Sequence, residues 1–114
     1  MVKVKKFVKS FKYSFIGLQH AFRYEQNFRI MLLLVLLSLI PLAVWPMEGW
    51  QKVAVIIAGM LMLAVELINT TIERMMDVLL PASLEEIRII KDVMAGAALT
   101  ASIGWLIVII IVFI

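Results

Sequence analysis

Three long apolar stretches, rarely interrupted by charge, constrain this chain more than any other feature. They cover residues from about 27 to 45, 50 to 73 and 92 to 114. A helix needs roughly 20 mainly apolar residues to cross the hydrocarbon core of a bilayer. Hydrophobic residues make up 64% of the sequence, whereas soluble domains contain about 45–50%. The pattern therefore predicts an all-α integral membrane protein with three transmembrane helices in one domain, residues 1–114.

Residues 1–25 have a different pattern from the rest of the chain. Apolar side chains recur every three or four residues, at Val4, Phe7, Val8, Phe11, Phe15, Leu18 and Phe22. Lysines occupy other positions, at Lys3, Lys5, Lys6, Lys9 and Lys12. This spacing predicts an amphipathic helix on the membrane surface, with anionic lipid rather than nucleic acid as its partner. We expect no cleaved signal peptide, because the first long apolar run starts only near Ile30.

The distribution of positive charge predicts the orientation of the spans. Lysine and arginine gather before the first span and between the second and third, where Arg74, Arg88 and Lys91 lie. The turn between the first two spans contains only Lys52. Because loops rich in lysine and arginine stay in the cytoplasm, we expect a cytoplasmic N-terminus and an external C-terminus.

The third span is rich in small residues, namely Ala95, Gly96, Ala97, Ala98, Ala101, Ser102 and Gly104. Small residues spaced four apart let helix backbones approach closely within a membrane. Three helices of this length can hardly enclose a site alone. We therefore expect the chain to form a homo-oligomer.

The second span contains the polar residues Glu66, Asn69 and Glu73, and Asp77 follows it. At about 100° per residue, these four lie within about 80° of one another on one helix face. A polar seam that holds helices together is one interpretation, and it would suffice for a single amide. We favour a functional site, because two carboxylates, an amide and a further aspartate exceed what packing requires.

Further charged residues are expected at the same cytoplasmic level as this stripe. Glu25 lies just before the first span, although by itself it could simply pair with Arg23 or Arg29. Lys91 and Asp92 lie at the start of the third span. Carboxylates at a membrane surface suit Mg²⁺, which takes oxygen ligands and is often shared with substrate phosphates, and a lysine there could meet a polyphosphate. We expect His20 to lie on a solvated face.

The string formed by residues 66–73, Glu-Leu-Ile-Asn-Thr-Thr-Ile-Glu, resembles the signature of prokaryotic diacylglycerol kinases. The similarity includes Asp77 and the Lys91-Asp92 pair at their spacings. Residues 11–18 and 20–29 are more similar to the Gram-positive branch, generally undecaprenol kinases. Neither a P-loop nor the protein-kinase motif set is present, so a kinase of neither common type is expected.

The resemblance implies a homotrimer of three-span protomers, with sites shared between subunits at the cytoplasmic face of the bacterial cytoplasmic membrane. Such an enzyme transfers the γ-phosphate of MgATP to a lipid hydroxyl. The resemblance assigns Glu66 as general base and gives Mg²⁺ to Glu25 and Glu73. Nucleotide contacts are implied for Lys6, Tyr13, Glu25, Glu73, Lys91 and Asp92. Supporting or lipid-entrance positions are implied for Asn69, Ser14, Asn27, Arg29 and Asp77.

The sequence departs from the family pattern at three places. Lys6 stands where the enterobacterial branch has arginine, which removes a bidentate fork. Leu84 and its neighbours replace a Tyr-His pair near the nucleotide. Met94 and Ala95 replace a Gly-Ser pair, which removes a hydroxyl and bears on lipid specificity.

Other interpretations stay open beside undecaprenol kinase. The lipid could be diacylglycerol, which also presents a primary hydroxyl at the interface. A small proton-coupled transporter would also use a membrane carboxylate, although such exporters usually need four spans. A structural subunit would use the polar stripe for assembly alone.

Overall fold

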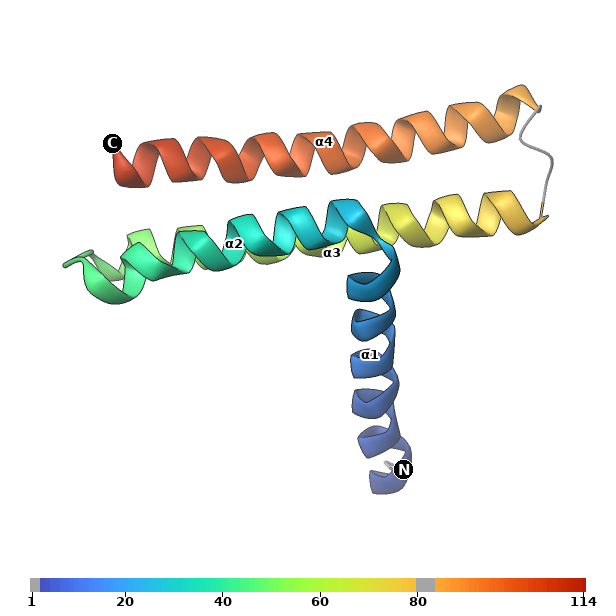
Figure 1. Ribbon diagram of the computed structural model, residues 1–114, viewed down its shortest axis with the longest axis horizontal. Helices are drawn as coiled ribbons and strands as arrows, with labels where there is room; N and C mark the ends of the chain where they lie inside the picture. Colours follow the sequence, from blue (N-terminus) through green and yellow to red (C-terminus); the bar gives the residue numbers. More distant parts are fainter. Residues whose placement is uncertain (1–2, 80–83) are drawn as a thin grey trace.

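The computed structural model describes residues 3–79 and 84–114, and within them every regular element is a helix. The helices are α1 (Val4–Tyr24), α2 (Gln26–Val44), α3 (Gly49–Leu79) and α4 (Glu85–Phe113). Helices α2, α3 and α4 run side by side in alternating directions, and α1 projects away from them (Figure 1). Among the described residues, three helices are long and apolar enough to cross a membrane, over Gln26–Val44, Gly49–Val78 and Glu85–Phe113. The predicted all-α fold with three such helices is confirmed.

Helix α1 leaves its apolar side chains uncovered. Ala21 is its buried residue, whereas Phe7, Phe11 and Phe15 are each more than half exposed. The amphipathic helix predicted for residues 1–25 therefore forms, but its apolar stripe finds little to pack against within the protomer. Such exposure is expected of a helix immersed in a membrane interface.

The corner between α1 and α2 is formed at Glu25. This residue has extended backbone angles, φ −109° and ψ 106°, which end one helix before the next begins. Arg29 Nη1 donates hydrogen bonds to the carbonyl oxygens of Phe22 and Arg23, at 3.0 and 2.9 Å. A cation at a helix C-terminus satisfies carbonyls that have no partner within the helix. Arg29, expected at the lipid entrance, thus has a structural role at this corner.

The turn between α2 and α3 follows local chemistry. Trp45 is extended, at φ −93° and ψ 147°, as expected for a residue before proline. The Gln51 side-chain oxygen accepts a hydrogen bond from the Glu48 backbone N–H at 2.9 Å. This contact between Glu48 and Gln51 is half of a capping box. Helix α3 therefore begins at Gly49, within residues 46–52, for which the sequence predicts a turn.

The core joins the three long helices in two clusters. One consists of Val35, Met62 and Trp105, with one residue from each helix, and the other of Leu42, Val55 and Val112. The sequence predicts Trp105, within the apolar third span, to be a packing residue, and its 9% exposure confirms this. Gly59 brings α2 and α3 close, because a Cβ atom there would lie 3.1 Å from Val35 Cγ1.

The helices α3 and α4 are longer than the spans predicted within them. The sequence predicts that the helix of the second span continues through Met76, and α3 ends at Leu79. Helix α4 begins at Glu85, ahead of the span predicted from residue 92. Ser83, with Glu86 three residues later, is a predicted N-cap for this helix, but it lies outside the described residues, and Leu84 holds the N-cap position. Both helices extend past the corner between α1 and α2 (Figure 1).

Candidate active site

A carboxylate and an amide lie buried on α3. Glu66 is 4% exposed and Asn69 is 7% exposed. In the described part of the chain, the Asn69 Oδ1 atom has no hydrogen-bond partner. A buried polar group without a partner is costly, and an ionisable group within a membrane helix is a functional candidate. The predicted polar stripe therefore begins with two groups that packing alone does not explain.

A cleft of about 410 Å³ lies beside these groups, where the α1–α2 corner meets α3. Its lining residues are Glu25, Thr70, Glu73, Arg74, Asp77 and Val78, and we call it the acid cleft. Both Glu25 and Glu73 are half-buried, and their negative charges act on Glu66. Helix spacing predicted that Glu73 and Asp77 lie on the same face of α3. The corner between α1 and α2 brings Glu25 into the same cleft, so Glu25 and Glu73, the two acids expected to bind metal, are neighbours.

Lys91 approaches this cleft from α4. Its Nζ atom lies 2.9 Å from Asp77 Oδ1, and the lysine side chain is 29% exposed. This ion pair joins the ends of α3 and α4, which lie far apart in sequence. Lys91 therefore places a positive charge in direct contact with Asp77, which is one of the residues that line the cleft.

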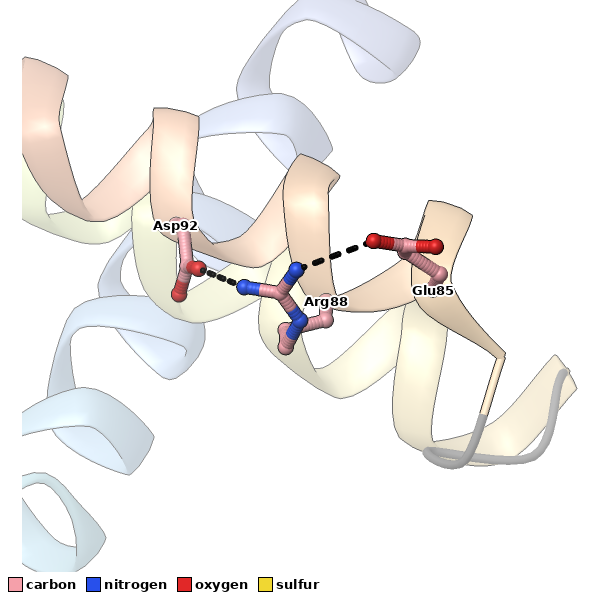
Figure 2. A network of polar contacts seen from close by, with 3 residues as sticks. All are labelled: Glu85, Arg88 and Asp92. Carbon is pink, nitrogen blue, oxygen red and sulfur yellow. Dashed lines mark hydrogen bonds and ion pairs between the residues drawn. The ribbon is translucent and has the colours of Figure 1, made fainter.

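Asp92 faces a different partner. Arg88 lies between Asp92 and Glu85 (Figure 2), with contacts of 3.2 and 3.3 Å. All three side chains are at least 60% exposed, and exposed pairs of this kind contribute about 0–1 kcal/mol. Asp92 is not among the residues that line the acid cleft.

Other predicted site residues also lie outside the cleft lining. These are Lys6, Tyr13, Ser14 and Asn27, all of them exposed on the protomer. Ser14 Oγ donates a hydrogen bond to the Ser10 carbonyl oxygen at 2.8 Å, as serines on helices often do. Their implied contacts with nucleotide or lipid stay predictions.

Sequence reasoning missed one contact at the site. Arg74 Nη1 lies 2.8 Å from His20 Nε2, and the two residues are 54 positions apart. The histidine is exposed, as expected, but it is bound to α3 rather than to solvent alone. No local pattern could have indicated this pair, because it joins two helices across the cleft.

An apolar groove of about 630 Å³ opens beside the same part of α3. Its lining comes from three helices: Phe15, Leu18, Gln19 and Phe22 of α1, Phe28 and Leu32 of α2, and Met60, Leu63, Ala64 and Leu67 of α3. Leu67 is the sequence neighbour of Glu66 and also lines a pocket with Glu25. The groove is thus an apolar space that ends near the buried carboxylate.

Comparison with known proteins identifies the family. The family model described as prokaryotic diacylglycerol kinase matches residues 12–113. The chain belongs to the prokaryotic diacylglycerol kinase family. It is 31% identical over 100 residues to a protein named diacylglycerol kinase from Synechocystis sp. (strain ATCC 27184 / PCC 6803 / Kazusa). The match covers 87% of this chain and 57% of that relative, so the chain spans a little over half of its length.

Family membership confirms the resemblance predicted from residues 66–73, whereas the Gram-positive branch stays a prediction. The family implies a nucleotide substrate and a divalent metal. Among the described residues, no cluster of three or more metal-ligating side chains is found. Two carboxylates in one cleft nevertheless fit Mg²⁺, which usually binds one or two carboxylates and takes its remaining ligands from water and substrate phosphates.

Proposed function

We propose that this chain is a lipid kinase that transfers the γ-phosphate of ATP to the hydroxyl of a membrane lipid. One observation carries the proposal: Glu66 is buried on α3, its sequence neighbour Leu67 lines the apolar groove, and Glu73, two turns further along the helix, lines the polar cleft together with Glu25. A lipid hydroxyl and a polyphosphate have opposite solubilities. A site for both needs such a junction, and family membership supports the same activity.

Glu66 acts as the general base in this proposal. It takes the proton of the lipid hydroxyl while the lipid oxygen bonds to the γ-phosphorus and the bond to the bridging oxygen of ADP breaks. A positioned base typically contributes about 10²–10⁴-fold to the rate. The Asn69 amide lies one turn away on the same helix face, and its buried Oδ1 atom has no partner among the described residues, so Asn69 is proposed to support the base.

Glu25 and Glu73 would hold Mg²⁺ in the cleft, where it would be shared with the nucleotide. A bound Mg²⁺ would supply charge neutralisation for the phosphate groups. Lys91, held by Asp77, adds positive charge at the far edge of the cleft. The half-buried position of Glu25 and Glu73 limits their contact with water, which strengthens these electrostatic interactions.

The spans would lie in the bacterial cytoplasmic membrane with this site at the cytoplasmic face. Support comes from the lysines of α1 and from Arg74, Arg88 and Lys91 near the facing ends of α3 and α4, because lysine and arginine favour the cytoplasmic side. Helix α1 would lie in the membrane surface, as its exposed apolar side chains favour. The lipid would then enter sideways through the apolar groove that α1 lines.

A homotrimer would complete the site. The small residues of α4 support it, because a Cβ atom added at Gly96 or Gly104 would meet nothing within 4 Å. A groove of about 540 Å³ opens along this face, between Ala97, Ala101 and Gly104 of α4 and Ala58 of α3. A neighbouring protomer packed there would bring its own side chains near the cleft. Tyr13 and Asp92 could then reach nucleotide bound to another subunit.

Undecaprenol is the proposed lipid, on the similarity of residues 11–18 and 20–29 to the Gram-positive branch. Diacylglycerol is the second candidate, because the matched relative is named diacylglycerol kinase. Both lipids present a primary hydroxyl, so the apolar groove alone does not separate them.

The test is ATP-dependent phosphate incorporation by purified protein in mixed micelles that contain undecaprenol and diacylglycerol side by side. We expect undecaprenol to be labelled faster. Faster labelling of diacylglycerol would correct the lipid and keep the kinase. Labelling of neither lipid, in folded protein with Mg²⁺ present, would overturn the kinase and favour the transporter or structural interpretations.

A further inference from the structure

The contact between Arg74 and His20 joins α3 to α1 beside the acid cleft. Arg74 Nη1 lies 2.8 Å from His20 Nε2. The His20 ring also lies against Tyr24, with ring centroids 4.6 Å apart. The imidazole is therefore held between its own helix and the arginine of α3.

The chemistry of the pair determines the state of the histidine. A guanidinium has five N–H donors and no acceptor, so His20 Nε2 must accept the hydrogen bond. The proton of the neutral ring then resides on Nδ1. This contact uses one N–H donor of the Arg74 guanidinium. The other four N–H donors can bind another group.

Arg74 also lines the cleft that contains Glu25, Glu73 and Asp77. The ion pairs found among residues 3–79 and 84–114 involve Arg88 and Lys91, and none involves Arg74. Its guanidinium is thus oriented by a neutral ring instead of being neutralised by a carboxylate. A guanidinium in this state suits bidentate binding of a phosphate group.

We propose that Arg74 binds the phosphate groups of the nucleotide, with His20 as the residue that positions it. The inference rests on the proposed function and adds two residues to its machinery. Phosphoryl transfer spreads negative charge over the oxygens of the transferred group. A pre-oriented arginine stabilises that charge without reorganisation during the reaction.

The first experiment compares Arg74→Ala and Arg74→Lys with the wild-type full-length protein in lipid-containing micelles. We expect Arg74→Ala to lower kcat/KM for ATP about 100-fold. Arg74→Lys should lower it about tenfold, because the charge remains while the planar fork is lost. Lys9→Ala is the matched control, because it removes one exposed positive charge from α1 and should leave activity unchanged.

The second experiment separates positioning from folding. His20→Leu should raise the KM for ATP more than it lowers kcat. His20→Gln should restore much of the loss, because its amide oxygen can accept from Arg74. A merely structural histidine would not be rescued by this particular acceptor.

The third experiment measures binding of ADP and adenosine by calorimetry and needs no lipid turnover. Arg74→Ala should weaken ADP at least tenfold and leave adenosine unchanged, because only ADP has phosphates. Equal weakening of both, or of neither, would overturn the inference, as would wild-type kcat/KM in Arg74→Ala. An inactive wild-type protein would overturn the proposed function, while the binding comparison would still decide the role of Arg74.

Discussion

At the scale of single residues, the acids of the chain differ mainly in their surroundings. Glu66 is 4% exposed and lies one turn from Asn69, whose Oδ1 atom has no partner among the residues that the structure describes. Glu86 is an exposed acid in the first turn of α4. The two side chains have the same chemistry, yet only Glu66 is buried, and its neighbours on α3 line an apolar groove and a polar cleft. Exposure therefore separates a candidate base from a solubilising charge.

The substitution Glu66→Gln tests the proposed base. It keeps the size and hydrogen-bonding shape of the side chain and removes its ability to accept a proton. We expect kcat for lipid phosphorylation to fall at least about 100-fold, with little change in the KM for ATP. Glu86→Gln is the matched control and should keep full activity. Near-normal turnover in Glu66→Gln would exclude this base.

The substitution Glu73→Gln tests the proposed metal ligand. With one carboxylate left in the cleft, Mg²⁺ should bind more weakly. We expect most activity to be lost at low Mg²⁺ concentration and partly restored when Mg²⁺ is in large excess, because a site with fewer carboxylates needs more metal to fill. Activity assayed across a Mg²⁺ titration gives the shift. An equal loss at every Mg²⁺ concentration would contradict a metal role for Glu73.

At the scale of elements, the corner between α1 and α2 sets where Glu25 lies relative to α3. Only this one residue separates the two helices. Arg29 holds the corner through the carbonyl oxygens of Phe22 and Arg23. Because Glu25 is at the corner itself, the direction of α1 and the position of this carboxylate are determined together.

The substitution Arg29→Gln tests the corner. It removes a charged donor from the C-terminus of α1, so we expect the free energy of unfolding to fall by about 1 kcal/mol. Denaturation in mixed micelles, followed by circular dichroism, measures this change. Lys12→Gln removes a charge from the exposed part of α1 and should have no effect. Equal stability of both variants would show that Arg29 does not hold the corner.

At the scale of the whole molecule, the protomer leaves two surfaces without a packing partner among the described residues. The apolar side of α1 is uncovered, and the small residues of α4 present an open face. In the proposed arrangement, a membrane interface would cover the first surface and a neighbouring protomer the second. The proposed assembly would then be linked to the proposed site, because α4 also carries Lys91.

The substitution Gly104→Leu tests the assembly face. Nothing within the protomer lies within 4 Å of the new Cβ, so the protomer should fold normally. We expect a bulky side chain to prevent close helix approach and to lower the mass of the oligomer, as measured by light scattering in detergent. Ala43→Leu, at an exposed position on α2, is the control and should leave the mass unchanged.

The helices follow from periodicity and hydrophobicity, which are local properties of the sequence. The apolar runs predicted the three long helices to within a few residues at most ends, because backbone groups in a membrane must be satisfied within the segment. Helix spacing also predicted that Glu66, Asn69 and Glu73 share one face. Helix α3 ends a few residues after the second predicted span and α4 begins before the third, because hydrophobicity indicates where a helix lies in lipid and not where it ends.

Contacts between helices were decided by the tertiary structure. The position of Glu25 beside Glu73 depends on the extended backbone at the corner and on where along α3 that corner packs. Lys91 meets Asp77, while Asp92 turns to Arg88 on its own helix. The pairing of His20 with Arg74 joins residues 54 positions apart. Periodicity describes one helix at a time, so the sequence by itself determined the elements and their polar faces, and only packing decided which faces meet.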